Sequence, residues 1–254
     1  MSRFFVDPAS IGKKYIYIDD KNDVKHMLSV LRMKKGDQLT VSDKSEWEYE
    51  CEISAIEDGQ ITLLITDKQK FASEPELRVT LFQGVPKGSK MDDIVRKTTE
   101  MGIAEIVPVF MDRTVVKDNG SYHKKVARMR SIADEASKQC GRGVIPDVPD
   151  HCGFKEMTDR LDKFDLVIFP YENEKGYTIK DALRKASDHA ANAEHDQLIR
   201  TCAIIIGPEG GFSDKEADIL KNTDSLCVTL GKTILRTETA GIVTLAMIMY
   251  ELEL

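Results

Sequence analysis

Short apolar runs, several with alternating polar residues, follow one another closely over the first 72 residues. They lie at 15–18, 37–42, 47–53 and 60–66. Strands of this length, with turn residues such as Gly36 and Asp43 between them, are typical of a small β-barrel. One helical stretch, 23–30, interrupts the strands. The pattern predicts an all-β domain over residues 1–72, with a polar, proline-bearing linker at 73–76.

From residue 77 the pattern changes to apolar strands that alternate with amphipathic helices. The predicted strands are 79–84, 103–110, 165–169, 203–206 and 226–230. The predicted helices are 91–101, 122–139, 179–193, 213–220 and 237–251. This alternation is typical of a parallel sheet that is covered by helices on both faces. The spacing of Ser213 and Glu216 predicts a capping box, which would begin a helix just after a run of glycines. An α/β domain is therefore expected over residues 73–254.

Composition narrows the class of protein. The chain is 41% hydrophobic, and no stretch approaches the roughly 20 apolar residues that a membrane helix needs. The N-terminus lacks the apolar core of a signal peptide, so we expect a cytoplasmic location. The five cysteines form no C-x-x-C pair and the histidines have no metal-ligand spacing, so no metal is expected. Cys202 and Cys227 are predicted to be core residues, Cys140 is a candidate exposed thiol, and His189 and His195 are expected at the surface.

A basic segment lies within an acidic chain. The net charge is −7, which by itself argues against a nucleic-acid partner. Between Arg113 and Arg142, however, eight residues are basic and three are acidic. Such a stripe can hold a phosphate backbone locally. A solvated helix face gives the same pattern, so both interpretations stay open.

Two glycine-marked loops follow predicted strands near the C-terminus. They are Gly207-Pro-Glu-Gly-Gly-Phe and Gly231-Lys-Thr-Ile-Leu-Arg-Thr-Glu-Thr-Ala. Ligands of open α/β sheets bind at the carboxyl ends of strands, so the loops predict one shared pocket. Neither loop is a dinucleotide or Walker motif, and a phosphate-bearing cofactor is not indicated.

The second loop contains apolar residues in a polar setting. Buried Ile234 and Leu235 would form a wall for a flat ligand such as an adenine ring. Without a ligand, the same loop is explained by an Arg236–Glu238 ion pair and a helix cap at Thr237 or Thr239.

The helix predicted over 122–139 carries two faces. The apolar face is formed by Val126, Met129, Ala133, Ala136 and Cys140. A second ridge carries Arg128, Glu135, Gln139 and Arg142, whose polar groups could hydrogen-bond a base edge. A solvent-facing ridge with contacts between successive turns is the alternative.

Several motifs together resemble the SPOUT-class RNA methyltransferases, and more narrowly the RsmE-type 16S ribosomal RNA uridine-N3-methyltransferases. The C-terminal motifs are the two glycine loops, extended to Ser213 and to Leu230–Ala240. The others are Arg3-Phe-Phe, His26-x-x-x-Val-Leu-Arg32, Lys35-Gly-Asp37, Lys87-Gly-x-Lys-Met-Asp92, Glu100-Met-Gly102 and Glu135-Ala-x-x-Gln-x-x-Arg142 with Pro146. The resemblance covers nearly the whole chain.

The resemblance implies a fold and an activity. The fold is a PUA-like RNA-binding β-barrel over 1–72, followed over 73–254 by a SPOUT-type parallel sheet with a C-terminal trefoil knot. The activity is S-adenosylmethionine-dependent methylation of N3 of a specific uridine in 16S ribosomal RNA, near the decoding region of the small ribosomal subunit. A cytoplasmic homodimer with its sites at the interface is expected, without membrane or metal partners.

The resemblance also implies residue roles. Expected cofactor contacts are Phe169, Pro170, Tyr171, Gly207, Pro208, Glu209, Gly210, Gly211, Leu230, Gly231, Ile234, Leu235 and Thr239. Expected catalytic residues are Arg236, Glu135, Gln139, Arg142 and Glu238. Expected RNA contacts are Arg3, His26, Arg32, Lys87, Lys90, Arg128 and Arg142, whereas at least one of Phe4 and Phe5 is expected in the core.

Two other functions stay open at this point. Ribose 2′-O-methylation is another SPOUT reaction and would give a different product nucleoside. A non-catalytic RNA-binding ribosome-assembly factor would use the barrel and the basic stripe, although the intact cofactor loops argue against it. A nucleotide hydrolase or kinase is disfavoured because the phosphate loop is missing.

Overall fold

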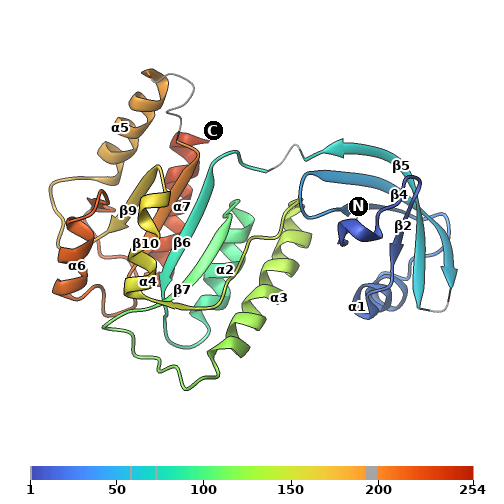
Figure 1. The fold of residues 1–254 in the computed structure, drawn as a ribbon, viewed down its shortest axis with the longest axis horizontal. Coiled ribbons are helices and arrows are strands. Elements are labelled where there is room, and N and C mark those ends of the chain that lie inside the picture. Colours follow the sequence, from blue (N-terminus) through green and yellow to red (C-terminus); the bar gives the residue numbers. More distant parts are fainter. Residues whose placement is uncertain (1, 58, 72–73, 193–198, 254) are drawn as a thin grey trace. The chain divides into compact units, whose positions relative to one another are not determined.

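The computed structural model describes residues 2–57, 59–71, 74–192 and 199–253, and the chain forms two compact units (Figure 1). Unit 1 comprises Met1–Glu74 and Ser137–Ile145, and unit 2 comprises Pro75–Ala136 and Pro146–Leu254. The sequence placed residues 137–145 in the second domain. They lie with unit 1 because Ser42 Oγ donates to the carbonyl of Gly143 at 2.5 Å and the Phe71 ring packs against the Gly143 backbone.

Unit 1 is a five-stranded sheet in the order β1-β3-β4-β5-β2. The strands are β1 (Arg3–Phe5), β2 (Tyr15–Ile18), β3 (Gln38–Ser42), β4 (Trp47–Glu57) and β5 (Gln60–Lys70). β1 pairs with β3 in parallel, and the other pairs are antiparallel. Helical turns η1 (Pro8–Ser10), α1 (Lys21–Lys25) and η2 (His26–Val30) join the strands. The four predicted strands are confirmed. At least one of Phe4 and Phe5 is expected in the core, and both are buried.

Unit 2 is a six-stranded parallel sheet in the order β11-β9-β10-β6-β7-β8. The strands are β6 (Arg78–Gly84), β7 (Glu105–Phe110), β8 (Cys152–Gly153), β9 (Leu166–Pro170), β10 (Thr201–Ile206) and β11 (Leu226–Val228). The helices are α2 (Lys90–Glu100), α3 (Tyr122–Cys140), α4 (Phe154–Thr158), α5 (Ile179–Asn192), α6 (Asp214–Lys221) and α7 (Thr237–Leu252), with a 3-10 turn η3 (Leu161–Lys163). The predicted parallel sheet with alternating helices is confirmed.

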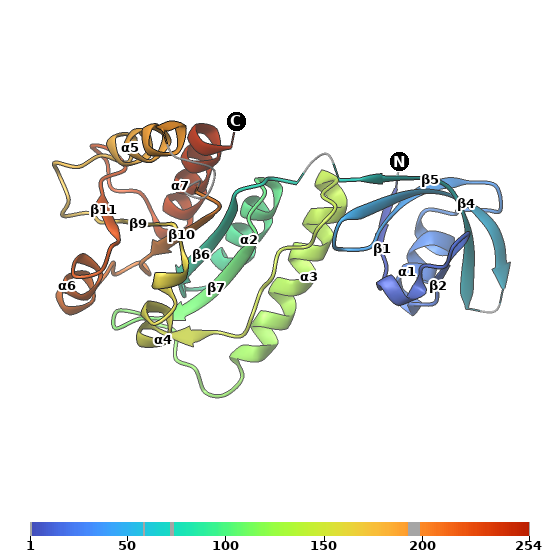
Figure 2. The same ribbon diagram turned by 45° about the horizontal axis from the view of Figure 1, so that its top comes forward.

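Alternation along the strands explains how helices cover both faces of this sheet. Phe82, Phe169 and Ile205 point to the face where residues of α4 and α6 complete a buried cluster. Leu81 and Gln83, on the opposite face of β6, lie against Gly241 of α7. Figures 1 and 2 show α2 and α7 side by side on that second face.

Helix α3 buries the predicted face, with one exception. Val126, Met129, Ala133 and Ala136 are buried, but Cys140 is exposed. Its prediction as a core-face residue is therefore wrong, because the helix ends at Cys140 and Gly141 turns the chain at a φ of +78°. Cys202 is fully buried and Cys227 is half-buried, while the side chains of His189 and His195 lie outside the described residues. Within the described ranges, no helix has the length and apolar character needed to cross a membrane.

Candidate functional site at the carboxyl edge of the sheet

Three loops leave the sheet side by side, after the neighbouring strands β9, β10 and β11. Because the strands are parallel, the loops 171–178, 207–212 and 229–236 begin at the same edge. The first and third loops are hydrogen-bonded to each other: the N–H of Thr229 donates to Tyr177 at 2.9 Å, and the N–H of Ile179 donates to Thr229 at 3.0 Å. The two glycine loops thus begin at one edge of the sheet, while the shared pocket that they predict stays a prediction.

The loop after β10 is packed closely around its glycines. Gly211 has a φ of +66°, and a Cβ there would lie 2.6 Å from Oε1 of Glu172 in the loop after β9. A Cβ on Gly84, at the end of β6, would lie 2.5 Å from the backbone nitrogen of Pro208. The backbone of this loop is therefore in close contact with the Glu172 side chain on one side and with the end of β6 on the other.

A buried polar relay fixes the start of α7 against this loop. Thr237 Oγ1 donates to the carbonyl of Gly207 at 2.6 Å and accepts from Nε2 of Gln83 at 2.9 Å. Gln83 is fully buried and Thr237 is 6% exposed. These two hydrogen bonds tie the start of α7 to the loop, although Oε1 of Gln83 is buried and receives no hydrogen bond from the described residues. The expectation that Thr237 or Thr239 caps the helix is wrong. The N-cap residue of α7 is Arg236, and its side chain makes no capping hydrogen bond.

Lys90, at the first position of α2, lies between two carboxylates. Its Nζ is 3.0 Å from Oε1 of Glu209 and 3.2 Å from Oε2 of Glu238. Glu209 also accepts the backbone N–H of Lys87 at 2.9 Å. Partial burial alone would raise the pKa of Glu209, but the hydrogen bonds from Lys87 and Lys90 outweigh it and lower this pKa. Glu238 pairs with Lys90, so the alternative Arg236–Glu238 ion pair is wrong.

The apolar residues of the third loop do not form a buried wall in this chain. Ile234 is 81% exposed and Leu235 is half-buried. The expectation that both are buried is therefore wrong for Ile234, which offers an uncovered apolar surface beside the glycine loops. An isolated exposed isoleucine is ordinary on a protein surface, so its meaning depends on the loops around it.

The other expected cofactor residues divide between the core and this edge. Phe169, Tyr171 and Pro208 are buried, and Phe169 and Tyr171 pack on Phe212 at ring distances of 5.9 and 6.3 Å. Gly210 accepts a hydrogen bond from Nη1 of Arg113 at 3.0 Å. At the edge itself, Pro170 and Leu230 are half-buried, and Gly231 and Thr239 are exposed.

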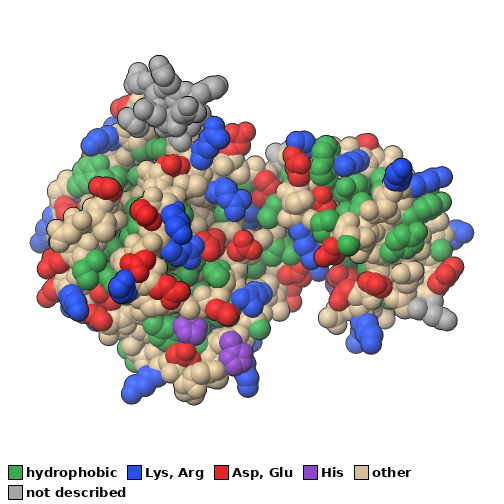
Figure 3. Space-filling view, in the orientation of Figure 1, with side chains coloured by type: hydrophobic (Ala, Val, Ile, Leu, Met, Phe, Trp, Pro, Cys, Tyr) green, Lys and Arg blue, Asp and Glu red, His purple; other side chains and the backbone are tan. Residues whose placement is uncertain are grey.

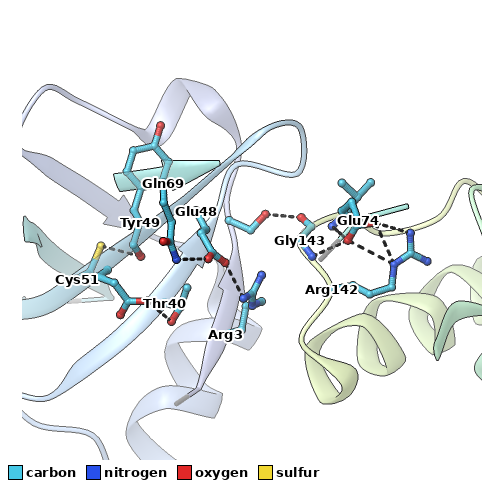
Figure 4. Close-up of polar contacts among 12 residues, drawn as sticks. Arg3, Thr40, Glu48, Tyr49, Cys51, Gln69, Glu74, Arg142 and Gly143 are labelled. Carbon is cyan, nitrogen blue, oxygen red and sulfur yellow. Dashed lines mark hydrogen bonds and ion pairs between the residues drawn. The ribbon is translucent and has the colours of Figure 1, made fainter. Parts of the chain in front are cut away.

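The predicted polar ridge is only partly present. Glu135 and Gln139 are exposed on α3, but Arg142 lies beyond the end of the helix and is 7% exposed. Its Nη2 donates to Oε2 of Glu74 at 2.8 Å (Figure 4). The placement of Arg142 on the same ridge is therefore wrong, because the turn at Gly141 directs it into unit 1.

The residues expected to contact RNA fall into two groups. Arg3, Lys90, Arg128 and Arg142 are engaged by carboxylates, with Arg3 2.7 Å from Glu48 and Arg128 2.8 Å from Asp92. His26, Arg32 and Lys87 are exposed. Arg32 has a φ of +56°, an uncommon conformation for a non-glycine residue.

Ion pairs also neutralise much of the basic stripe. Besides Arg128 and Arg142, Arg130 pairs with Asp150 and Lys138 pairs with Asp23, each at 3.2 Å. Figure 3 shows acidic and basic side chains interspersed on the visible face. The stripe is thus mostly a set of paired charges, which weakens the interpretation that it forms one phosphate-binding surface.

Sequence reasoning missed Gln83, Glu172 and Arg113 as residues that hold the loops. Gln83 had a recognisable signal, since it is a polar residue within the apolar run of β6. Thr237 lay inside a quoted motif but was considered only as a cap. Among the described residues, no group of three or more histidine, cysteine, aspartate or glutamate side chains is placed to hold a metal ion.

Two RNA methyltransferase family models match this chain. The family model of the RNA methyltransferase domain matches residues 73–249, and that of the RNA methyltransferase PUA domain matches residues 18–66. Ribosomal RNA small subunit methyltransferase E of Bacillus subtilis is 30% identical over 259 residues, covering 100% of this chain and 98% of the relative.

Two solved structures are similar over nearly the whole chain. A Legionella pneumophila putative methyltransferase in complex with its cofactor SAM is 28% identical, with a TM-score of 0.81 over 98% of this chain and 96% of that one. Ribosomal RNA small subunit methyltransferase E of Neisseria gonorrhoeae, bound to S-adenosyl methionine, is 26% identical, with a TM-score of 0.82 over 98% and 97%. With a domain match that spans more than half of its length and a relative matched almost end to end, this chain belongs to the RNA methyltransferase family that includes the ribosomal RNA small subunit methyltransferases E.

Proposed function

We propose that the protein uses S-adenosylmethionine to methylate N3 of a specific uridine in 16S ribosomal RNA, near the decoding region of the small ribosomal subunit. The observation that carries this proposal is the meeting of three loops at one sheet edge, with the glycine loop held by Thr237 and Gln83. The Bacillus and Neisseria relatives bear the name of this class of enzyme, and the Neisseria structure holds the cofactor.

The residues at this edge fit S-adenosylmethionine. Gly207 and Gly211 carry no side chains of their own, so the backbone of this loop can approach a ligand closely, beside the Glu172 carboxylate that lies against Gly211. Ile234 offers an exposed apolar surface for the adenine. We propose that the loop 207–211 holds the cofactor, with Pro170, Tyr171, Leu230, Gly231, Ile234, Leu235 and Thr239 contributing contacts. When bound, S-adenosylmethionine supplies an electrophilic methyl group.

Methyl transfer to N3 also requires that the N3 proton leave and that negative charge on the base be stabilised. N3 of uridine is protonated at neutral pH, so the enzyme needs a group that accepts the proton or stabilises charge on the base oxygens. Arg236 is exposed at the start of α7, and no ion-pair partner of its guanidinium lies among the described residues. We propose Arg236 for charge stabilisation and Glu238, Glu135 or Gln139 for orienting or deprotonating the base. Arg142 is left out because Glu74 engages it in a buried pair.

RNA binding is proposed for both units. In unit 1 the exposed side chains of His26 and Arg32 support it, and in unit 2 that of Lys87 does. Phosphate contacts of this kind position the RNA and carry no sequence information, so the uridine must be selected elsewhere.

The path of the chain supports a trefoil knot, which we also propose. After the edge strand β11 the chain returns to the middle of the sheet, where Thr237 contacts Gly207 and Gln83. On the way, residues 228–229 are hydrogen-bonded to residues 171–179, after β9. A chain that returns past two earlier loops is the arrangement from which a threaded C-terminus arises, although knots are rare in proteins.

A cytoplasmic homodimer is proposed as the working form. Tyr250, near the end of α7, is 70% exposed, and large exposed aromatic residues are enriched where protein surfaces meet. A ribosomal RNA substrate would place the protein in the cytoplasm. Sedimentation of the purified protein would test the dimer directly.

The proposal is tested first by calorimetric titration with S-adenosylmethionine, and then by analysis of the nucleoside formed in small-subunit RNA. We expect micromolar binding and N3-methyluridine. A 2′-O-methylated nucleoside would replace the proposed reaction with ribose methylation, and failure of well-folded protein to bind the cofactor would favour an RNA-binding assembly factor.

At saturating cofactor, Arg236→Ala and Glu135→Gln are expected to lower kcat; wild-type values in both would remove these residues from the mechanism.

A further inference from the structure

Lys90 occupies a position where a cation is unfavourable. It is the first residue of α2, and the positive end of the helix dipole disfavours a nearby ammonium group. The preceding N-cap residue, Ser89, makes no side-chain cap hydrogen bond. A lysine at this position is stabilised only if nearby carboxylates offset the dipole, and Glu209 and Glu238 do so.

The two carboxylates come from two different segments at the candidate site. Glu209 lies in the glycine loop after β10, and Glu238 lies in the first turn of α7. Oε2 of Glu238 is buried and receives no regular hydrogen bond from the described residues, so its ion pair with Lys90 offsets the cost of burial. The hydrogen bond to Glu209 raises the pKa of Lys90, which keeps the ammonium charged.

We infer that Lys90 is a positioning residue for the methyl-transfer site: it holds the glycine loop and the start of α7 together through Glu209 and Glu238, and it does not serve as a phosphate contact for RNA. The inference rests on the proposed function and changes the RNA-binding role that the sequence motif implied for Lys90.

The physical reason is repulsion between the carboxylates. Both lie within 3.2 Å of one nitrogen atom, so they face each other across a short distance once the ammonium is removed. Without the ammonium between them, the two carboxylates repel each other. Either Glu209 moves with the glycine loop, or Glu238 moves with the first turn of α7 beside Arg236. Both movements would disturb the edge where the cofactor is proposed to bind.

The test compares Lys90→Met with Lys97→Met, a control on the same helix whose side chain is exposed and lies outside the site. For Lys90→Met we expect cofactor affinity by calorimetry to fall about tenfold and kcat to fall with it, because a paired charge is left uncompensated. Affinity for small-subunit RNA and its dependence on salt should match wild type. Lys97→Met should match wild type in all these measurements, and Lys90→Arg should recover part of the cofactor affinity.

Binding of RNA distinguishes the two roles without reference to activity. If Lys90 contacted a phosphate, Lys90→Met would reduce by about one the magnitude of the slope of log RNA affinity against log salt concentration, and it would leave cofactor affinity unchanged. That result would overturn the inference. A second measurement is the cycle of Lys90→Met with Glu209→Gln. Non-additive losses of cofactor affinity are expected, and strict additivity would contradict a shared role. If the wild-type protein does not bind the cofactor, the proposed function is contradicted, and this inference is contradicted with it.

Discussion

Arg142 and Glu74 form a buried ion pair in unit 1, with Nη2 2.8 Å from Oε2 (Figure 4). Glu74 Oε1 also accepts the backbone N–H of Gly143 at 2.8 Å and that of Val144 at 3.1 Å. Glu74 is the last residue of the first segment of unit 1, and Arg142 belongs to the segment that returns to it after α3. One carboxylate thus fastens the returning segment, and this gives the arginine of the helix motif a structural role.

Replacing Arg142 by glutamine should therefore lower stability. Removal of one partner leaves the half-buried Glu74 carboxylate without its charge partner, and we expect a loss of about 2 kcal/mol in the free energy of unfolding. Arg128→Gln is the matched control, since the Arg128 side chain is 70% exposed and such pairs contribute less than about 1 kcal/mol. Chemical denaturation measures both. An Arg142→Gln variant with wild-type stability and a lowered kcat would return Arg142 to the catalytic residues.

Gly211 should tolerate no side chain. At a φ of +66° any side chain strains the backbone, and valine there would also have to displace the Glu172 carboxylate, whose Oε1 lies 2.6 Å from the position of a Cβ. We expect Gly211→Val to weaken cofactor binding at least tenfold in calorimetry. Gly211→Val in a Glu172→Ala background separates backbone strain from close approach, because this truncation removes the carboxylate whose Oε1 lies 2.6 Å from the position of a Cβ. Equal loss of affinity with and without the Glu172 side chain would show that strain, and not the proximity of Glu172, is responsible.

Most elements of the fold could be predicted from the sequence, because long apolar runs and helical periodicity are local signals. The capping box at Ser213 and Glu216 is present, and the start of α6 follows it directly. The missed elements are short. β1, β8 and α4 span 3, 2 and 5 residues, too few to show a period.

The candidate site was predictable only in outline. Glycines marked the loops, but the partners of charged residues are set by contacts between distant segments. Arg142 and Glu74 are 68 positions apart, and Lys90 and Glu209 are 119 apart. No local pattern indicates which carboxylate an arginine or lysine will meet. For that reason the sequence assigned these cations to RNA, whereas the structure pairs them with carboxylates.

Asp43 should make unit 1 less stable in acid. Burial opposes its ionisation, but hydrogen bonds from the backbone N–H groups of Trp47, Ser45 and Glu46 outweigh burial and lower its pKa below the ordinary 3.8. A lowered pKa contributes stability above that ordinary value, and the contribution is lost as the pH falls through the pKa of the folded state.

Asp43→Asn tests this account. Hydrogen bonds to a charged acceptor contribute about 2 kcal/mol, so the variant should be less stable than wild type by about that amount near neutral pH. The difference should shrink below pH 3.8, where wild type gains the proton as well. Unfolding curves at several pH values measure it, and a difference that stays constant down to the acid end would show that ionisation of Asp43 contributes nothing.

The five cysteines should differ sharply in reactivity toward a thiol reagent. Cys140 is exposed, whereas burial raises the pKa of Cys51 to about 12 and that of Cys152 to about 11. Burial also raises the pKa values of Cys202 and Cys227. The thiolate is the reactive form, so in the native protein at about pH 8 we expect one fast-reacting thiol and four slow ones. Cys140→Ser should remove the fast phase, and denaturant should make all the remaining thiols react together. A fast phase that persists in Cys140→Ser would mean that another of these buried thiols becomes accessible in the native state.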